Sequence, residues 1–219
     1  LELGGLVHTA WTAGLSRPVK IFGPPGLDQI WDGFRRMMAF DINLRIQDEG
    51  RIPLDDLVEL HVFKANENTA IKVYDSGEFC VTALRNTHPP VDQSYALRFD
   101  GAGKAVCFSG DTSYLPALAN FAQGSDILVH EAMLGAGIDY VIGKTKTIDN
   151  RLRNHLLRSH SFAGEAAQIA AAANVGHLVL SHLIPPERSI CDDAMWKAGV
   201  EPYFVGKCSV GYDGMSVSF

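Results

Sequence analysis

Three short segments of the chain join an apolar, strand-like run to a side chain that commonly binds metal ions. The runs at residues 79–84, 105–108 and 178–180 lead, in that order, to His88, Asp111 and His182. Because a buried strand offers no ligand to solvent, a site built on several strands collects its donors at their ends. Two neutral imidazoles suit Zn²⁺ or a similar first-row ion, and a carboxylate can join two ions through its two oxygens. We therefore predict a metal site in which Asp111 is the bridging ligand.

The residues beside these donors strengthen the prediction. Gly110 permits a backbone angle that a residue with a side chain resists, and prolines stiffen the loops that follow His88 and His182. Any one of the 8 histidines, taken alone, is more often a surface or core residue than a ligand. It is the combination of donor, glycine and proline that indicates a site.

Five segments, taken in order, resemble the metallo-β-lactamase superfamily, and within it the branch of ribonuclease Z and related phosphodiesterase-like and arylsulfatase-like hydrolases. They are a His-Pro followed by an apolar strand at 88–99, Ser-Gly-Asp-Thr at 109–112, His-Glu-Ala at 130–132, Ser-His-Ser at 159–161, and Ser-His at 181–182. The resemblance covers nearly the whole chain. It implies an α/β fold, an αββα sandwich of two mixed β-sheets flanked by helices, formed as a single domain by residues 1–219.

The resemblance also implies a role for each candidate residue. Two divalent metal ions are expected, Zn²⁺ first with Mn or Fe as alternatives, with His88 on one ion, His182 on the other and Asp111 joining them. Glu131 and His160 resemble the pair that serves the leaving group in ribonuclease Z-like enzymes, in which a carboxylate holds an imidazole whose proton passes to the departing oxygen. A purely structural hydrogen bond is the alternative for this pair.

One departure from the family is evident in the sequence. The signature His-X-His-X-Asp-His, which supplies most of the metal ligands in relatives, does not occur in these 219 residues. The chain begins Leu-Glu-Leu-Gly-Gly-Leu, which resembles the segment that follows the signature, so we expect the domain to be N-terminally incomplete and inactive by itself. The alternative is a variant that lost the signature and became a non-catalytic binding domain.

Two classes of function therefore follow from the sequence. The first is a metal-dependent hydrolase of a phosphodiester, a sulfate ester or a lactone, with a small-molecule ester favoured as substrate. Ribonuclease Z-type tRNA 3′ processing is the alternative within this class. It is not favoured, because no long Gly-rich arm is recognisable and Arg188 stands farther from His182 than in relatives. The second class is the non-catalytic binding domain.

Composition limits the partners without naming them. A net charge of −6 with 47% hydrophobic residues fits an ordinary globular protein, so a nucleic-acid substrate would need a local basic patch. Five basic residues between 144 and 158 form one candidate patch, although a solvated surface explains them equally well. No apolar run is long enough to span a membrane. The 4 cysteines lack Cys-X-X-Cys spacing, which slightly favours a cytoplasmic location without excluding export, and a homodimer is compatible with these features.

Hydrophobic periodicity predicts the elements that position these residues. Helices are expected at residues 1–14, 27–40, 115–123 and 161–173, the last of them capped by Ser161. Further strands are expected at residues 19–22, 57–64, 69–74 and 126–129. Residues 45–56 read as turn-rich. Residues 135–149 read as an ordered surface loop or lid near the site, with a disordered loop as an equal alternative, and His155 is expected to face solvent.

Overall fold

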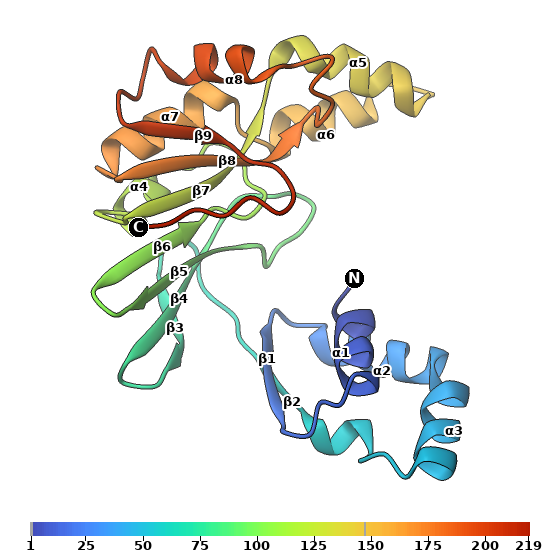
Figure 1. Cartoon of the computed structure of the whole chain (residues 1–219). Helices are drawn as coiled ribbons and strands as arrows, with labels where there is room; N and C mark the ends of the chain where they lie inside the picture. Colours follow the sequence, from blue (N-terminus) through green and yellow to red (C-terminus); the bar gives the residue numbers. More distant parts are fainter. Residues whose placement is uncertain (1, 147) are drawn as a thin grey trace. The chain divides into compact units, whose positions relative to one another are not determined.

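The structure is a computed structural model that describes residues 2–146 and 148–219 (Figure 1). The chain forms two compact units, the first ending at Lys64 and the second running from Ala65 to Phe219. That the two belong to a single domain, as the sequence analysis expects for residues 1–219, stays a prediction.

The N-terminal unit consists of helices packed with two short strands. Its elements are α1 (Leu3–Thr12), β1 (Val19–Gly23), α2 (Leu27–Met37), α3 (Ala39–Glu49), a 3-10 helix η1 (Leu54–Leu57) and β2 (Val58–Val62), and β1 pairs with β2 in parallel. Its core gathers the indole rings of Trp11 and Trp31 with Ile42 and Leu54. The Trp11 indole N–H donates to the carbonyl of Ile52 at 2.9 Å, so the one polar atom of this buried ring is satisfied.

The helical boundaries of this unit differ from the sequence prediction. The helix expected at 27–40 ends at Met37, and the chain starts a new helix, α3, which continues to Glu49 through residues expected to form turns. The prediction was wrong because Arg45 lies one helical turn from both Asp41 and Glu49 and forms an ion pair of 2.9 Å with each. These i,i+4 pairs and the burial of Ile42 stabilise a polar helix.

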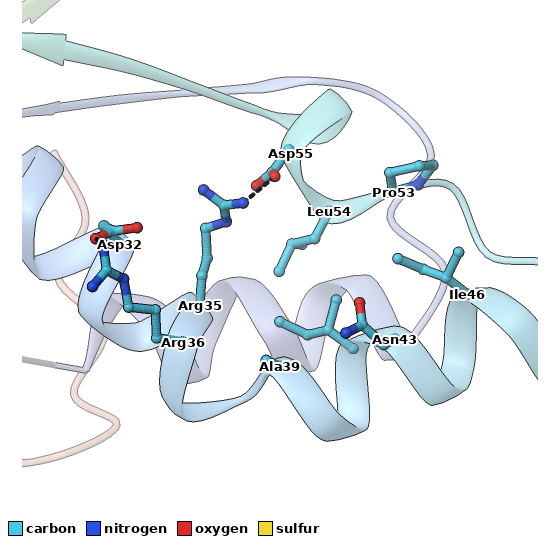
Figure 2. A pocket seen from close by; sticks show the side chains of 10 residues that line it. Asp32, Arg35, Arg36, Ala39, Asn43, Ile46, Pro53, Leu54 and Asp55 are labelled. Atoms are coloured by element: carbon cyan, nitrogen blue, oxygen red, sulfur yellow. Dashed lines mark hydrogen bonds and ion pairs between the residues drawn. The ribbon is translucent and has the colours of Figure 1, made fainter.

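A hollow of about 300 Å³ lies in the same unit, between α2, α3 and the segment around η1. Figure 2 shows the side chains that line it. The charged side chains that line it are paired with one another: Arg35 with Asp55, and Arg36 with Asp32 at 2.7 Å. None of the predicted site residues lines this hollow.

The C-terminal unit is built on a seven-stranded mixed sheet whose strands follow one another in chain order (Figure 1). The strands are β3 (Ile71–Asp75), β4 (Phe79–Arg85), β5 (Tyr95–Gly101), β6 (Lys104–Phe108), β7 (Ile127–Met133), β8 (His177–Ile184) and β9 (Lys207–Val210). Pairing is antiparallel from β3 to β6 and parallel from β6 to β9. The predicted α/β class is confirmed, with one mixed sheet in this unit and a two-stranded parallel sheet in the other.

Five helices accompany this sheet: α4 (Ala117–Phe121), α5 (Gly135–Thr145), α6 (Arg151–Ser159), α7 (Ala163–Ala172) and α8 (Asp193–Val200). Figure 1 shows α7 and α8 beside the parallel strands, and their buried side chains form one core with α4 and the sheet. On the buried face of α7, Ala163, Ala166, Ala167 and Ala170 are almost fully buried, and small residues let this face pack closely against the sheet. Among the described residues no helix is long and apolar enough to cross a membrane.

Two local predictions in this unit are wrong. Residues expected to form a loop at 135–149 include helix α5, because Ile138 is buried against Met133, Leu156 and Ile184 in a small core of its own. Ser161 does not cap α7, which begins at Ala163; its hydroxyl donates instead to the Thr112 carbonyl at 2.7 Å. In both cases a contact distant in sequence decided a local conformation.

Gly110 gives a direct test of the turn that carries Asp111. Its φ of 59° lies in the left-handed region, and an added Cβ would meet the Tyr95 carbonyl oxygen at 2.5 Å. We expect Gly110→Ala to lower the free energy of unfolding by about 2 kcal/mol or more, from backbone strain plus the clash. Urea unfolding measures this change.

Gly103→Ala is the matched control for that substitution. Gly103 also has a positive φ, 72°, but an added Cβ there meets nothing within 4 Å. Its substitution should cost only the backbone strain, about 1 kcal/mol. Equal losses in the two variants would show that the close approach of Gly110 to Tyr95 is not what requires a glycine.

Candidate metal and catalytic site

The direction of the strands brings the predicted residues to one edge of the sheet. Because β5 is antiparallel to both β4 and β6, those two strands run the same way, and β7 and β8 are parallel to β6. The carboxyl ends of all four strands therefore meet at the same edge. His88 lies three residues beyond β4 and Asp111 three residues beyond β6, so both stand there.

His182 reaches the edge through an irregularity in β8. Ser181 pairs with Glu131 and Leu183 with Ala132, so His182 has no partner on β7 and occupies a β-bulge with a φ of 43°. A bulge re-aims the side chain of its extra residue. The Nε2 of His182 lies 3.6 Å from an Asp111 carboxylate oxygen, and both side chains are exposed in part.

His88 is oriented by a backbone carbonyl. Its Nδ1 lies 3.0 Å from the carbonyl oxygen of Ser159, and since a carbonyl only accepts, Nδ1 carries the proton and donates. The lone pair of the neutral ring is then on Nε2. A ligating histidine commonly donates from its other nitrogen in this way, which sets its tautomer and its direction.

Glu131 and His160 form the pair that the sequence predicted. The Glu131 side chain is 1% exposed, and its Oε1 accepts from His160 Nδ1 at 2.9 Å. The backbone N–H groups of Thr112 and Ser161 also donate to this carboxylate, at 2.8 and 3.3 Å. Burial raises the pKa of Glu131, and the hydrogen bond from His160 opposes that shift.

His160 lies between the two predicted histidine ligands. Its ring centroid is 5.1 Å from that of His88 and 5.4 Å from that of His182. The structure thus brings together His88, Asp111, Glu131, His160 and His182, although they come from five separate segments of the chain.

His155 is the residue that sequence reasoning missed. It was expected to face solvent, yet it is half-buried on α6 with its ring 5.7 Å from both His88 and His160. Burial, with smaller effects of His160, His88 and Arg158, lowers its pKa. Four positions separate His155 from Ser159, one helical turn, so both lie on the same face of α6. A helix prediction for residues 151–159 would have supplied that signal.

His130 is a second buried histidine at this edge, with a different character. Its Nδ1 donates to the Glu131 carbonyl at 2.7 Å. Burial lowers its pKa to about 4, and this hydrogen bond opposes the shift only in part. His130 is therefore neutral at pH 7 and supports the strand that carries Glu131.

An apolar cavity of about 950 Å³ opens beside the histidines. His155, His160 and His182 line it together with aliphatic side chains, among them Val129, Leu152, Leu156, Val179, Ile184 and Val217. Arg188 and Tyr212 line it as well, and the guanidinium lies 5.7 Å from the centre of the Tyr212 ring.

The donor set fits a divalent metal ion. Three imidazoles, those of His88, His155 and His160, offer ligand atoms that all lie within 4.8 Å of one another, and a carboxylate stands beside His182. Neutral imidazoles with carboxylate oxygens are the ligands that first-row divalent ions accept.

Comparison with known proteins identifies the family. The family described as Beta-lactamase superfamily domain matches residues 35–183, and the chain belongs to it. Ribonuclease Z of Mycobacterium bovis is 28% identical over 215 residues, which cover 97% of this chain and 72% of that protein. Ribonuclease Z of Mycolicibacterium gilvum is 27% identical over 215 residues, covering 97% of this chain and 71% of its own length.

Solved structures agree on the fold. The metallo-beta-lactamase fold protein YhfI of Bacillus subtilis superposes with a TM-score of 0.63 at 18% identity, over 98% of this chain and 70% of that one. The short form of human tRNase Z superposes with a TM-score of 0.63 at 21% identity, over 99% of this chain and 73% of that one. The predicted class, a metal-dependent hydrolase of the metallo-β-lactamase fold, is confirmed.

Proposed function

We propose that the protein hydrolyses an ester-type bond, namely a phosphodiester, a sulfate ester or a lactone, with two divalent metal ions, Zn²⁺ in the first place and Mn or Fe as alternatives. His88 and His182 would each hold one ion, and the two oxygens of Asp111 would join them. Glu131 and His160 would serve the leaving group. The observation that carries the proposal is the 2.9 Å hydrogen bond from His160 to buried Glu131, with the His160 ring between His88 and His182.

The metal ligands in this proposal have the required chemistry. When bound, two such ions lower the pKa of water and offset negative charge on the reacting group. Asp111 supplies an anionic oxygen 3.6 Å from His182, and the Ser159 carbonyl directs the Nε2 lone pair of His88. These residues would hold and orient the metal ions, and the proton of the reaction would be supplied by His160.

His160 supplies the proton in this proposal. Its Nδ1 proton is engaged by Glu131, so the second proton of the protonated ring lies on Nε2. As the bond to the leaving oxygen breaks, that oxygen takes the Nε2 proton and the ring returns to its neutral form. The Glu131 carboxylate, held by two backbone N–H groups, stabilises the imidazolium before the transfer.

The cavity favours a small-molecule ester. Its lining is mainly aliphatic beside His160 and His182, which suits a substrate with an apolar group next to the scissile bond. Arg188 also lines it and offers a cation to an anionic substrate, although an Asp193 oxygen 3.3 Å from its guanidinium offsets part of that charge.

RNA is the second candidate substrate, favoured by the 28% identity to ribonuclease Z over 97% of this chain. The five basic residues between 144 and 158 support an RNA substrate less than the sequence suggested. Lys144 pairs with Glu187, Arg151 with Asp149 and Arg153 with Asp139, so three of the five cations are already offset. Nucleic-acid binding gains most from cations that are free to neutralise phosphates.

The two substrates are compared on the same preparation, expressed with any coding sequence that precedes Leu1. We expect turnover of aryl phosphodiesters, aryl sulfates or lactones to exceed cleavage of a precursor RNA with a 3′ trailer, measured as kcat/KM. Faster RNA cleavage would replace the small-molecule ester by the second candidate. A preparation that neither binds metal nor hydrolyses any of these substrates would favour the non-catalytic binding domain.

Asp111→Asn tests the bridging ligand. The substitution keeps the shape of the side chain and removes the charge that offsets two dications, so metal content and hydrolysis should fall together. Metal analysis and turnover are measured on the same sample, with Asp48→Asn, at an exposed position of α3, as the control. Near-normal turnover in the Asp111 variant would show that Asp111 is a turn residue and not a metal ligand.

His160→Ala tests the leaving-group role. The variant should keep the metals held by His88, Asp111 and His182, yet lose about 10²- to 10⁴-fold in rate on substrates with poor leaving groups. Nitrophenolate leaves without a proton, so activated esters should suffer far less, and the defect should grow with leaving-group pKa.

Glu131→Gln is the companion variant and should show the same trend more mildly. Because Glu131 is buried, circular dichroism must first establish that this variant folds. A His160 defect of equal size on activated and unactivated esters would remove the proton-donor role.

A further inference from the structure

We propose that His88, His155 and His160 together form a metal site of their own, which binds one divalent transition ion through three imidazole nitrogens. Metal binding at this site needs neither Asp111 nor His182 and does not rest on the proposed function; only the inhibition of hydrolysis described below rests on it. It adds His155, which the leaving-group mechanism does not use.

The distances support a common ligand sphere. One ligand nitrogen from each ring lies within 4.8 Å of the others, and the ring centroids are separated by 5.1, 5.7 and 5.7 Å. Ligands at about 2.1 Å from one tetrahedral ion are about 3.4 Å apart, so the rings need to close by roughly 1 Å.

Ser159 orients two of the three rings. Its carbonyl accepts from His88 Nδ1 at 3.0 Å, and its hydroxyl donates to the Pro89 carbonyl at 2.8 Å. The Ser159 hydroxyl has one hydrogen, which it gives to Pro89. In the 3.3 Å hydrogen bond between this hydroxyl and His155 Nδ1, the imidazole is therefore the donor. Glu131 accepts from His160 Nδ1 in the same manner. Each Nδ1 is therefore protonated, and each lone pair is on Nε2.

The three Nε2 atoms are left without partners of their own. Within residues 2–146 and 148–219, none of them has a hydrogen-bond donor from the protein. Three lone pairs with their opposite nitrogens already engaged form a ligand set of the kind that zinc accepts.

An ion at this site would compete with hydrolysis. The Nε2 of His160 cannot carry a proton for the leaving group while it ligates a metal, and His88 cannot serve both sites at once. Excess metal should therefore inhibit the enzyme through the residues that the reaction uses, and the inhibition should require His155.

The test is a titration of metal-free protein with Co²⁺, followed by visible absorption, and with Zn²⁺, followed by calorimetry. We expect His155→Ala to weaken the ion bound by the three imidazoles by at least about 100-fold. Ser159→Ala, which releases His155 but keeps the carbonyl that holds His88, should weaken it by about 10-fold. His61→Ala is the matched control, because His61 is exposed and belongs to the N-terminal unit.

Asp111→Asn separates this site from the one in the proposed function. The three-imidazole ion should survive that substitution, and raised Zn²⁺ should inhibit hydrolysis less in His155→Ala than in the unaltered protein. Affinity unchanged in a folded His155→Ala would overturn the proposal and leave the dinuclear site standing. The proposal would also be overturned if Asp111→Asn abolished all metal binding while His155→Ala left metal binding unchanged.

Discussion

The buried carboxylate of Glu131 is the interaction on which this site depends. A charge that is 1% exposed is costly unless it is fully bonded, and here three donors from two distant segments converge on it. Thr112 donates from the turn after β6, and His160 and Ser161 donate from the end of α6. One strand residue thereby holds the loop of Asp111 and the segment of His160 in place.

Further hydrogen bonds attach the remaining loop. The Asn86 side chain donates to the Ser109 carbonyl at 2.7 Å, and the Thr87 backbone donates to the Thr112 hydroxyl at 3.2 Å. The loop of His88 is therefore joined to the turn of Asp111 before any ligand arrives. A site whose ligands are held by such outer contacts loses less conformational entropy when it binds an ion.

His160 takes part in both proposed activities of the site, leaving-group catalysis and metal binding. Its Nδ1 donates to Glu131, and its ring lies 5.1 to 5.7 Å from the rings of His88, His155 and His182. Its Nε2 is left for either a proton or a metal ion. If Nε2 of His160 carries a proton, the ring can serve leaving-group catalysis; if it carries a metal ion, the ring is a ligand. Aliphatic side chains line the cavity beside the ring, so a substrate held there would lie next to Nε2.

The sequence alone determined the strand character of the ligand-bearing runs, the requirement for glycine at position 110, and the identity of the Glu131 and His160 pair. These signals are local: an apolar run, a turn residue and a short motif each lie within a few positions. The bulge at His182, helix α5, the role of Ser161 and the position of His155 were decided only in the tertiary structure. Each of them depends on a partner far along the chain, as His88 depends on a carbonyl 71 residues away, and hydrophobic periodicity carries no record of such a partner.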